Sequence, residues 1–166
     1  MQTYEQVMYF VDDKVRILKL VGTLRFKSAP YLEKALSYLK EYSQEIPVII
    51  DLTETEYMDS TVMGTMAKLF LHEQLKSETS ARYATIVFKD EDVKKIFSTM
   101  GLNSFFNFQK TDPRINIPAQ NFMKCEALLE DRQSLKESIS SAHQTLSKFN
   151  AHNEDFERVV QLLKDK

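Results

Sequence analysis

The stretch that decides the fold of this chain runs from VIIDL at residues 48–52 to MDSTVMG at residues 58–64. Its first part is a continuous apolar run with one carboxylate, which is typical of a strand covered on both faces. Its second part places Asp59 before an apolar series, and aspartate is a favoured N-cap of a helix. The stretch therefore predicts a buried strand, a polar turn and a helix that begins at two hydroxyl side chains, Ser60 and Thr61.

Hydroxyl groups at the start of a helix lie where an anion is favoured. Free backbone N–H groups and the positive end of the helix dipole both stabilise negative charge there. A phosphate on Ser60 or Thr61 would carry about −1.5 to −2 charges and would stand beside Asp59. The local residues leave two interpretations open: a turn that only caps the helix, or a modification site whose charge changes a partner surface.

Strands and helices alternate on both sides of this stretch. Apolar runs predict further strands at residues 6–11, 15–21, 83–88 and 105–108. Ser28-Ala29-Pro30 opens a helix, because either of the first two residues can cap it and proline is tolerated in a first turn. Asp90 starts another helix, which Gly101 can end. The alternation predicts an α/β domain with a mixed or largely parallel sheet packed by helices.

The motif carries a resemblance to a known family. DLT at residues 51–53 and MDST at residues 58–61, followed by Met63-Gly64, resemble the signature of STAS domains, in particular the anti-sigma factor antagonists. The flanking segments match in the same order, at residues 15–20, 22–24, 86–88, 93–97, 101–102 and 105–108. Val62 departs from the pattern, because the family commonly has glycine there.

The resemblance implies a set of functional residues. Ser60 would be phosphorylated by a partner-switching serine kinase, with Thr61 as the lesser candidate. Asp51 would help to position the serine or a kinase-bound Mg²⁺-nucleotide, and Gly22 and Thr23 would lie near the partner-facing end of the sheet. The expected partner-binding residues are Gly22, Thr23, Asp51, Asp59, Ser60, Thr61, Met63 and Gly64.

Composition divides the chain into a domain at residues 1–110, a connector at 111–118 and a helical extension at 119–166. The extension has neither glycine nor proline after Pro118, and it carries a heptad repeat with Cys125 at an a position. Three arrangements stay open: an intermolecular coiled coil that makes a homo-oligomer, a hairpin that breaks at residues 150–153, and a helix that packs back on the domain. An extension that covers Ser60 and inhibits the domain is a further possibility.

Bulk properties exclude several classes of function. A net charge of −2 gives no reason to expect nucleic-acid or membrane binding. A single cysteine excludes an intrachain disulfide, and with no signal peptide or apolar span it predicts a cytoplasmic protein. The three histidines show no metal-ligand spacing. We therefore expect neither catalytic residues nor a cofactor, and no enzyme.

The leading hypothesis is a partner-switching regulator of transcription. The resemblance implies that it binds a serine-kinase anti-sigma factor while Ser60 is unphosphorylated and releases that factor once Ser60 carries a phosphate. A PP2C-type phosphatase would restore binding. The alternative is a non-catalytic scaffold, or an accessory module of a membrane transporter, that assembles through the helical extension.

Overall fold

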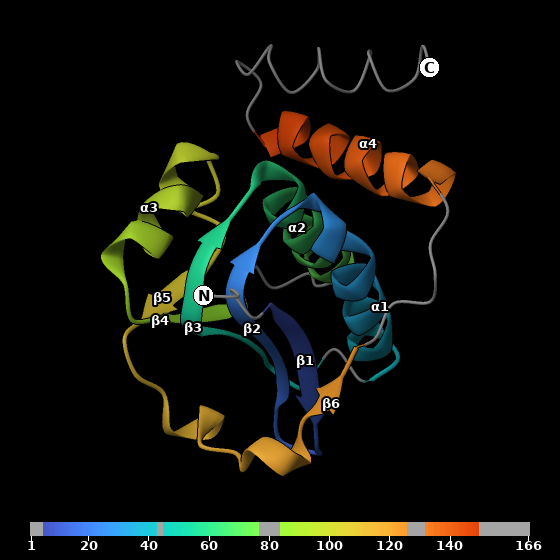
Figure 1. Ribbon diagram of the computed structural model, residues 1–166. Helices are drawn as coiled ribbons and strands as arrows, with labels where there is room; N and C mark the ends of the chain where they lie inside the picture. Colours follow the sequence, from blue (N-terminus) through green and yellow to red (C-terminus); the bar gives the residue numbers. More distant parts are fainter. Residues whose placement is uncertain (1–4, 43–44, 77–83, 126–131, 150–166) are drawn as a thin grey trace.

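The computed structural model describes residues 5–42, 45–76, 84–125 and 132–149. A six-stranded sheet with the order β5-β4-β3-β2-β1-β6 forms its centre (Figure 1). The strands are β1 (Gln6–Val11), β2 (Arg16–Leu24), β3 (Val48–Met58), β4 (Thr85–Phe88), β5 (Asn107–Gln109) and β6 (Met123–Lys124). The α-helices are α1 (Ala29–Lys40), α2 (Ser60–Lys76), α3 (Glu91–Thr99) and α4 (Arg132–Phe149).

The sheet is mixed. Strand β1 pairs antiparallel with β2 and with β6, whereas the pairs β2–β3, β3–β4 and β4–β5 are parallel. Parallel strands need crossover connections, and α1, α2 and α3 supply them. The predicted α/β class with a mixed sheet and packing helices is confirmed.

The main core lies between one face of the sheet and helices α1, α2 and α3. Alternate residues of β3, Ile50 and Leu52 among them, face this core together with apolar residues from all three helices. Ile49 instead belongs to a smaller cluster on the opposite face. The central strand is therefore covered on both sides, as its continuous apolar run predicts.

The segment after β5 covers that opposite face. Residues 113–115 and 119–121 form single 3₁₀ turns, and Ile115, Ile117 and Phe122 pack against the smaller cluster. The chain then adds β6 to the edge of β1. The predicted helical extension differs here, because residues 119–125 hold a 3₁₀ turn and a strand, and the helix begins only at Arg132.

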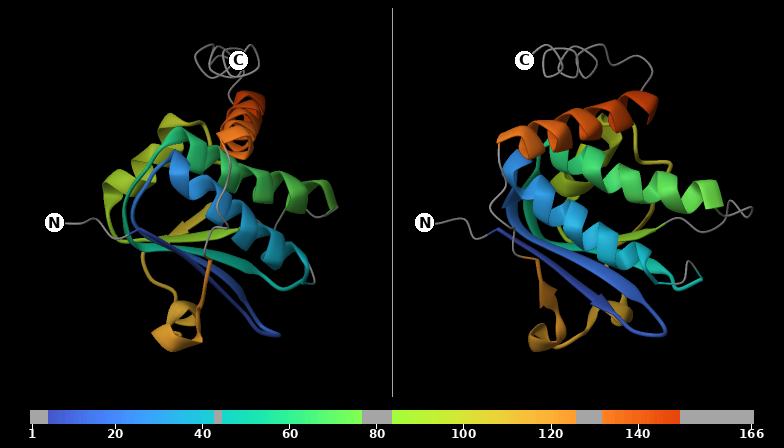
Figure 2. Two further views of the ribbon diagram at one scale, coloured as in Figure 1. Left: turned by 45° about the vertical axis from the view of Figure 1, so that its right-hand side comes forward. Right: turned by 90° about the vertical axis from the view of Figure 1, so that its right-hand side faces the viewer.

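Helix α4 lies across α1 and α2 on the helical side of the molecule (Figure 2). Cys125, the first a position of the predicted heptad, is buried beside β1, where its backbone N–H donates to Val7 O at 2.9 Å. Within α4, Ala142 and Leu146 are buried on the domain. The heptad positions of α4 thus serve intramolecular packing, which was one of the three predicted arrangements. The predicted break at residues 150–153 lies outside the described residues.

Candidate functional site

The turn between β3 and α2 is closed by the side chain and backbone of Asp59. Its Oδ1 accepts a hydrogen bond from Val62 N–H at 3.0 Å, and its backbone carbonyl accepts one from Met63 N–H at 3.1 Å. The Asp59 N–H donates to Leu24 O at 3.1 Å, which ties the start of α2 to the end of β2. The predicted N-cap is confirmed, and it holds the next two residues in a defined place.

The two hydroxyl groups at the start of α2 differ in exposure. Ser60 is half-buried, whereas Thr61 is only 3% exposed. A kinase needs to bring the accepting hydroxyl close to its nucleotide, so the less buried residue is the easier substrate. Ser60 is therefore the more accessible of the two hydroxyl groups.

A histidine from the extension contacts both hydroxyl groups. His143 Nε2 lies 3.0 Å from Ser60 Oγ and 3.5 Å from Thr61 Oγ1. Burial lowers the pKa of His143, although the negative charge of Asp59 acts in the opposite direction. The neutral imidazole is therefore favoured at pH 7, and it can accept a hydrogen bond from the Ser60 hydroxyl or donate one to it.

Helices α2 and α4 approach each other closely at Gly64. A Cβ atom added to Gly64 would lie 2.2 Å from the carbonyl oxygen of Ala142 and 2.9 Å from its Cα. No side chain larger than hydrogen fits between the two backbones at that distance. Gly64, which the sequence assigns to partner binding, is thus the contact point of α4.

Further polar and apolar contacts hold α4 on the domain. Ser138 Oγ donates a hydrogen bond to Glu33 Oε2 of α1 at 3.1 Å, and the other carboxylate oxygen of Glu33 pairs with Lys68 of α2 at 2.8 Å. Leu146 is fully buried and belongs to the main core. Contacts with α1, α2 and the core therefore fix the helix over the Ser60 turn.

The other predicted site residues fall into two groups. Gly22 and Thr23 pair with the last part of β3, opposite Thr55 and Tyr57, so they lie at the same end of the sheet as Ser60. Met63 is fully buried in the main core and has no surface for a partner.

Asp51 stands apart from this end of the sheet. It lies on the face opposite α2, 2% exposed, and its carboxylate accepts hydrogen bonds from Thr53 N–H at 3.0 Å and Thr53 Oγ1 at 2.7 Å. Its other oxygen is 4.0 Å from Lys19 Nζ. The structure does not bring Asp51 together with Ser60, because Asp51 is in the middle of β3 and Ser60 follows its end.

An exposed patch beside the turn was missed by sequence reasoning. We define the rim as Arg25, Phe26 and Tyr57, which lie at or just after the ends of β2 and β3. Phe26 and Tyr57 are 38% and 42% exposed, and the Arg25 guanidinium lies 5.4 Å from the centre of the Tyr57 ring. Aromatic residues and arginine are the types enriched in binding hot spots. Tyr57, immediately before MDST, is the only signal that the sequence offered.

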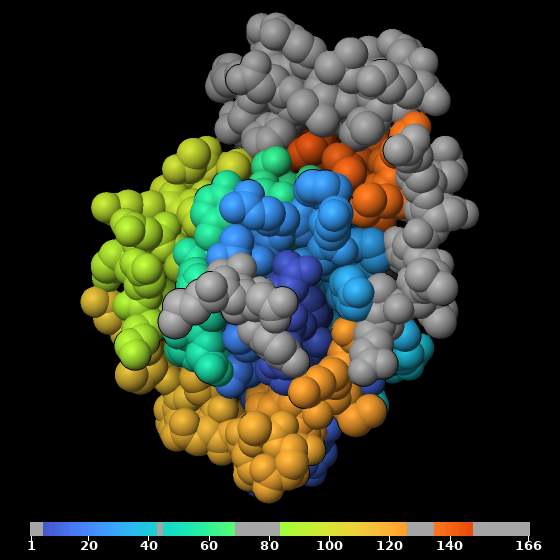
Figure 3. Space-filling view, viewed as in Figure 1, coloured from blue at the N-terminus to red at the C-terminus, as the bar shows by residue number. Residues whose placement is uncertain are grey.

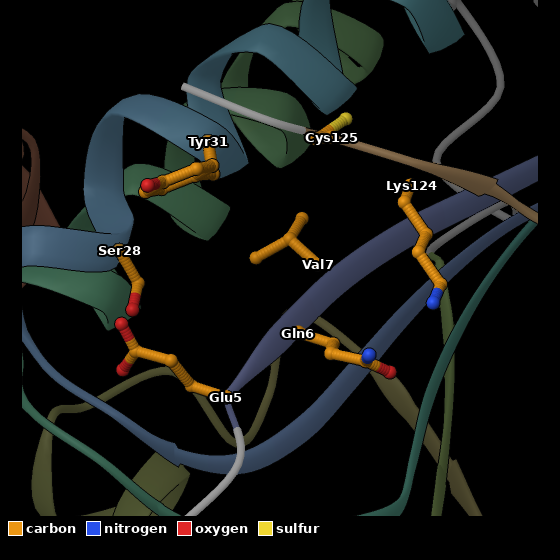
Figure 4. Close-up of a pocket in the computed structure, with 7 residues that line it drawn as sticks. All are labelled: Glu5, Gln6, Val7, Ser28, Tyr31, Lys124 and Cys125. Atoms are coloured by element: carbon orange, nitrogen blue, oxygen red, sulfur yellow. The ribbon is translucent and has the colours of Figure 1, made fainter. Parts of the chain in front are cut away.

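A separate cavity of about 350 Å³ lies between β1, α1 and β6 (Figure 4). Its lining includes Glu5, Ser28, Tyr31, Lys124 and Cys125. Ser28, one of the two predicted capping residues, stands at the N-cap position of α1, but its Oγ is buried and has no hydrogen-bond partner among the described residues. Burial raises the pKa of the Cys125 thiol, which makes it a poor nucleophile. This lining shows neither a metal-ligand set nor a single dominant charge.

Comparison with known proteins assigns the domain. The family model of the STAS domain matches residues 6–114, so the chain belongs to the STAS family. One similar solved structure is an anti-sigma factor antagonist from Mycobacterium paratuberculosis, with a TM-score of 0.51 and 18% identity. The match covers 65% of this chain and 87% of that one, and at this identity it supports the fold. No protein of curated function matches the chain in sequence.

The part of the chain that the structure describes lacks two further kinds of feature. None of the described helices is both long enough and apolar enough to span a membrane. Among the same residues, no three histidine, cysteine or acidic side chains gather closely enough to hold a metal ion.

Proposed function

We propose that this STAS protein is a partner-switching regulator whose switch is the phosphorylation of Ser60. The observation that carries the proposal is the position of the Ser60 hydroxyl, half-buried at the capped start of α2 and next to the carboxylate of Asp59. The fold of an anti-sigma factor antagonist supports the same class of function. In this proposal the unphosphorylated chain binds a serine-kinase anti-sigma factor, and a PP2C-type phosphatase reverses the modification.

Electrostatics explains how one phosphate would act as a switch without refolding the domain. The helix start tolerates the dianion, because free N–H groups and the helix dipole stabilise negative charge. A partner seated on the rim and the Ser60 turn meets two additional charges next to Asp59. Unit charges 4 Å apart interact by about 4 kcal/mol at an effective dielectric of 20, which corresponds to about a thousandfold in affinity.

The test is the phosphorylation state of the protein isolated from its own cells. Intact mass and peptide mass spectrometry should find one phosphate on Ser60, and a Ser60→Ala variant should carry none. A Thr61→Ala variant is the matched control and should still be phosphorylated. The partner captured by the Ser60→Ala protein should include a serine kinase, which the Ser60→Asp protein should bind at least tenfold more weakly.

An unmodified chain under both growth and stress conditions would contradict the proposal. Equal binding of the kinase to the Ser60→Ala and Ser60→Asp proteins would contradict it as well. The scaffold and transporter-module alternatives predict the first of these results. In both of them the chain catalyses nothing and acts by assembly.

A further inference from the structure

The surface that the proposed function assigns to the partner is already occupied by a segment of the same chain. Helix α4 lies over the start of α2, where His143 contacts Ser60 and Thr61, and Ala142 contacts Gly64 (Figure 2). In the space-filling view the orange atoms of α4 lie directly against the blue atoms of the N-terminal half (Figure 3). A partner that covers Ser60 and Gly64 cannot bind while α4 is in this place.

The same contacts shield Ser60 from a kinase. The hydroxyl is 3.0 Å from His143 Nε2, and a group at that distance occupies the space through which a phosphoryl donor must approach. In-line transfer brings the nucleotide phosphate directly against the accepting oxygen, with the attacking and leaving oxygens on opposite sides of phosphorus. Phosphorylation therefore requires His143 to move away from Ser60.

Among the residues whose burial the structure describes, α4 buries fewer apolar side chains on the domain than α1 does. Its buried positions include the polar residues Ser138, His143 and Thr145 beside Ala142 and Leu146. The buried residues of α1 are all apolar, from Ala29 to Leu39. Burial of a hydrogen-bonded polar group contributes little net stability, whereas burial of a large apolar side chain contributes considerably more. Elements with few buried apolar contacts are the first to open locally.

We infer that α4 is a built-in competitor of the partner: the docked helix keeps the Ser60 surface closed, and partner or kinase binds only after α4 leaves it. This inference rests on the proposed function. The rim formed by Arg25, Phe26 and Tyr57 stays exposed while α4 is docked, so it offers a first contact to the partner. The apparent affinity of the partner is reduced by the fraction of molecules in which α4 is undocked.

The first test measures closure without a kinase or partner. The full chain carries Ser60→Cys as a reporter and Cys125→Ala to remove the native thiol, and the probe is fluorescein maleimide. Ala142→Arg introduces a large charged side chain on the buried face of α4, whereas Gln144→Arg introduces the same side chain at an exposed position of that helix. We expect Ala142→Arg to accelerate labelling at least tenfold and Gln144→Arg to leave the rate unchanged.

Equal labelling rates in the two variants would overturn the inference. Hydrogen exchange of β3 amides shows whether the domain remains folded in each protein. Should Ala142→Arg unfold β3, Leu146→Ala is the second variant, because it removes apolar contacts of α4 with the core without adding a charge. It should accelerate labelling while β3 stays protected, and an unchanged rate would again overturn the inference.

The second test measures competition and separates the two proposals. With Ser60 and Cys125 restored, the kinase captured through the Ser60→Ala protein should bind the Ala142→Arg chain at least tenfold more tightly than the Gln144→Arg chain. Faster labelling with equal kinase affinity would overturn the competitor role and leave the phosphorylation switch intact. Absence of phosphate on Ser60, with labelling still accelerated, would instead contradict the proposed function alone.

Discussion

Replacement of Gly64 by alanine should loosen α4 and stabilise the domain beneath it. The added Cβ would lie 2.2 Å from Ala142 O, whereas ordinary van der Waals contact begins at 3.4 Å. The obstacle is backbone on both sides, so the two helices must separate by about 1 Å, a gap that forfeits a quarter to a half of the dispersion energy of the atoms involved. Overpacking of this kind costs about 1 to 3 kcal/mol.

Within α2 itself, the same Gly64→Ala substitution is stabilising. Glycine within a helix is less stable than alanine by about 0.5 to 1 kcal/mol. That gain does not depend on α4, so it belongs to the domain alone. The docking equilibrium should therefore shift toward the undocked state by about 5- to 150-fold, which is what 1 to 3 kcal/mol corresponds to.

Native-state hydrogen exchange followed by mass spectrometry separates the two effects. Peptides from α4 should exchange about 5- to 150-fold faster in Gly64→Ala, and peptides from β3 should exchange equally fast or more slowly. Lys95→Ala in α3 is the control, because Lys95 is exposed and its substitution also favours helix without touching α4. Unchanged exchange in α4 of a folded Gly64→Ala protein would refute the contact between Gly64 and Ala142 that the reasoning assumes.

Three further predictions concern single side chains. Docking of α4 should weaken as the pH falls below the ordinary pKa of histidine, because burial lowers the pKa of His143 and the undocked side chain binds the proton more readily. Since maleimide reacts with the thiolate, the labelling rate of the Ser60→Cys reporter is divided at each pH by the rate of the same thiol in the Ala142→Arg chain. This ratio should rise as the pH falls, and His143→Gln should flatten the rise. Asp59→Ala should destabilise the protein by about 0.5 to 2 kcal/mol through loss of the helix cap, as urea denaturation measures, and an unchanged midpoint would contradict the capping role. The Arg114 hydrogen bond and charge hold the pKa of Asp112 below its usual range, so the carboxylate stabilises the fold at neutral pH and less so as acid protonates it; Asp112→Asn should lower stability at pH 7, and the difference from the unchanged protein should shrink in acid.

Much of the fold could be predicted from local pattern. The apolar run of β3, the cap at Asp59 and the alternation of strands with helices each depend on residues close in sequence, and all are present in the structure. The boundaries were less accurate, because β3 continues to Met58 through residues that do not read as a buried strand. Pairing with β2 supplies their hydrogen bonds, and that partner is distant in sequence.

The candidate site was predicted only in part. Ser60, Thr61 and Gly64 are adjacent in one motif and remain together at the start of α2, where Asp59 fixes them. Asp51 belongs to the same motif and yet faces away, because successive side chains of a strand alternate between the two faces and β3 extends beyond it. Proximity in sequence therefore did not imply proximity in the site.

The sequence by itself determined the α/β class and the place of a hydroxyl pair at a helix start, because capping and apolar periodicity act over a few residues; its motif added the resemblance to STAS domains. Only the tertiary structure decided what covers that pair. No sequence signal links Gly64 to Ala142 or Ser60 to His143, and these contacts depend on how α4 packs across α1 and α2. The heptad pattern supplied an apolar stripe, but such a stripe packs equally well against another chain or against its own domain. Which of the two it contacts depends on the complementary surface that the folded domain presents.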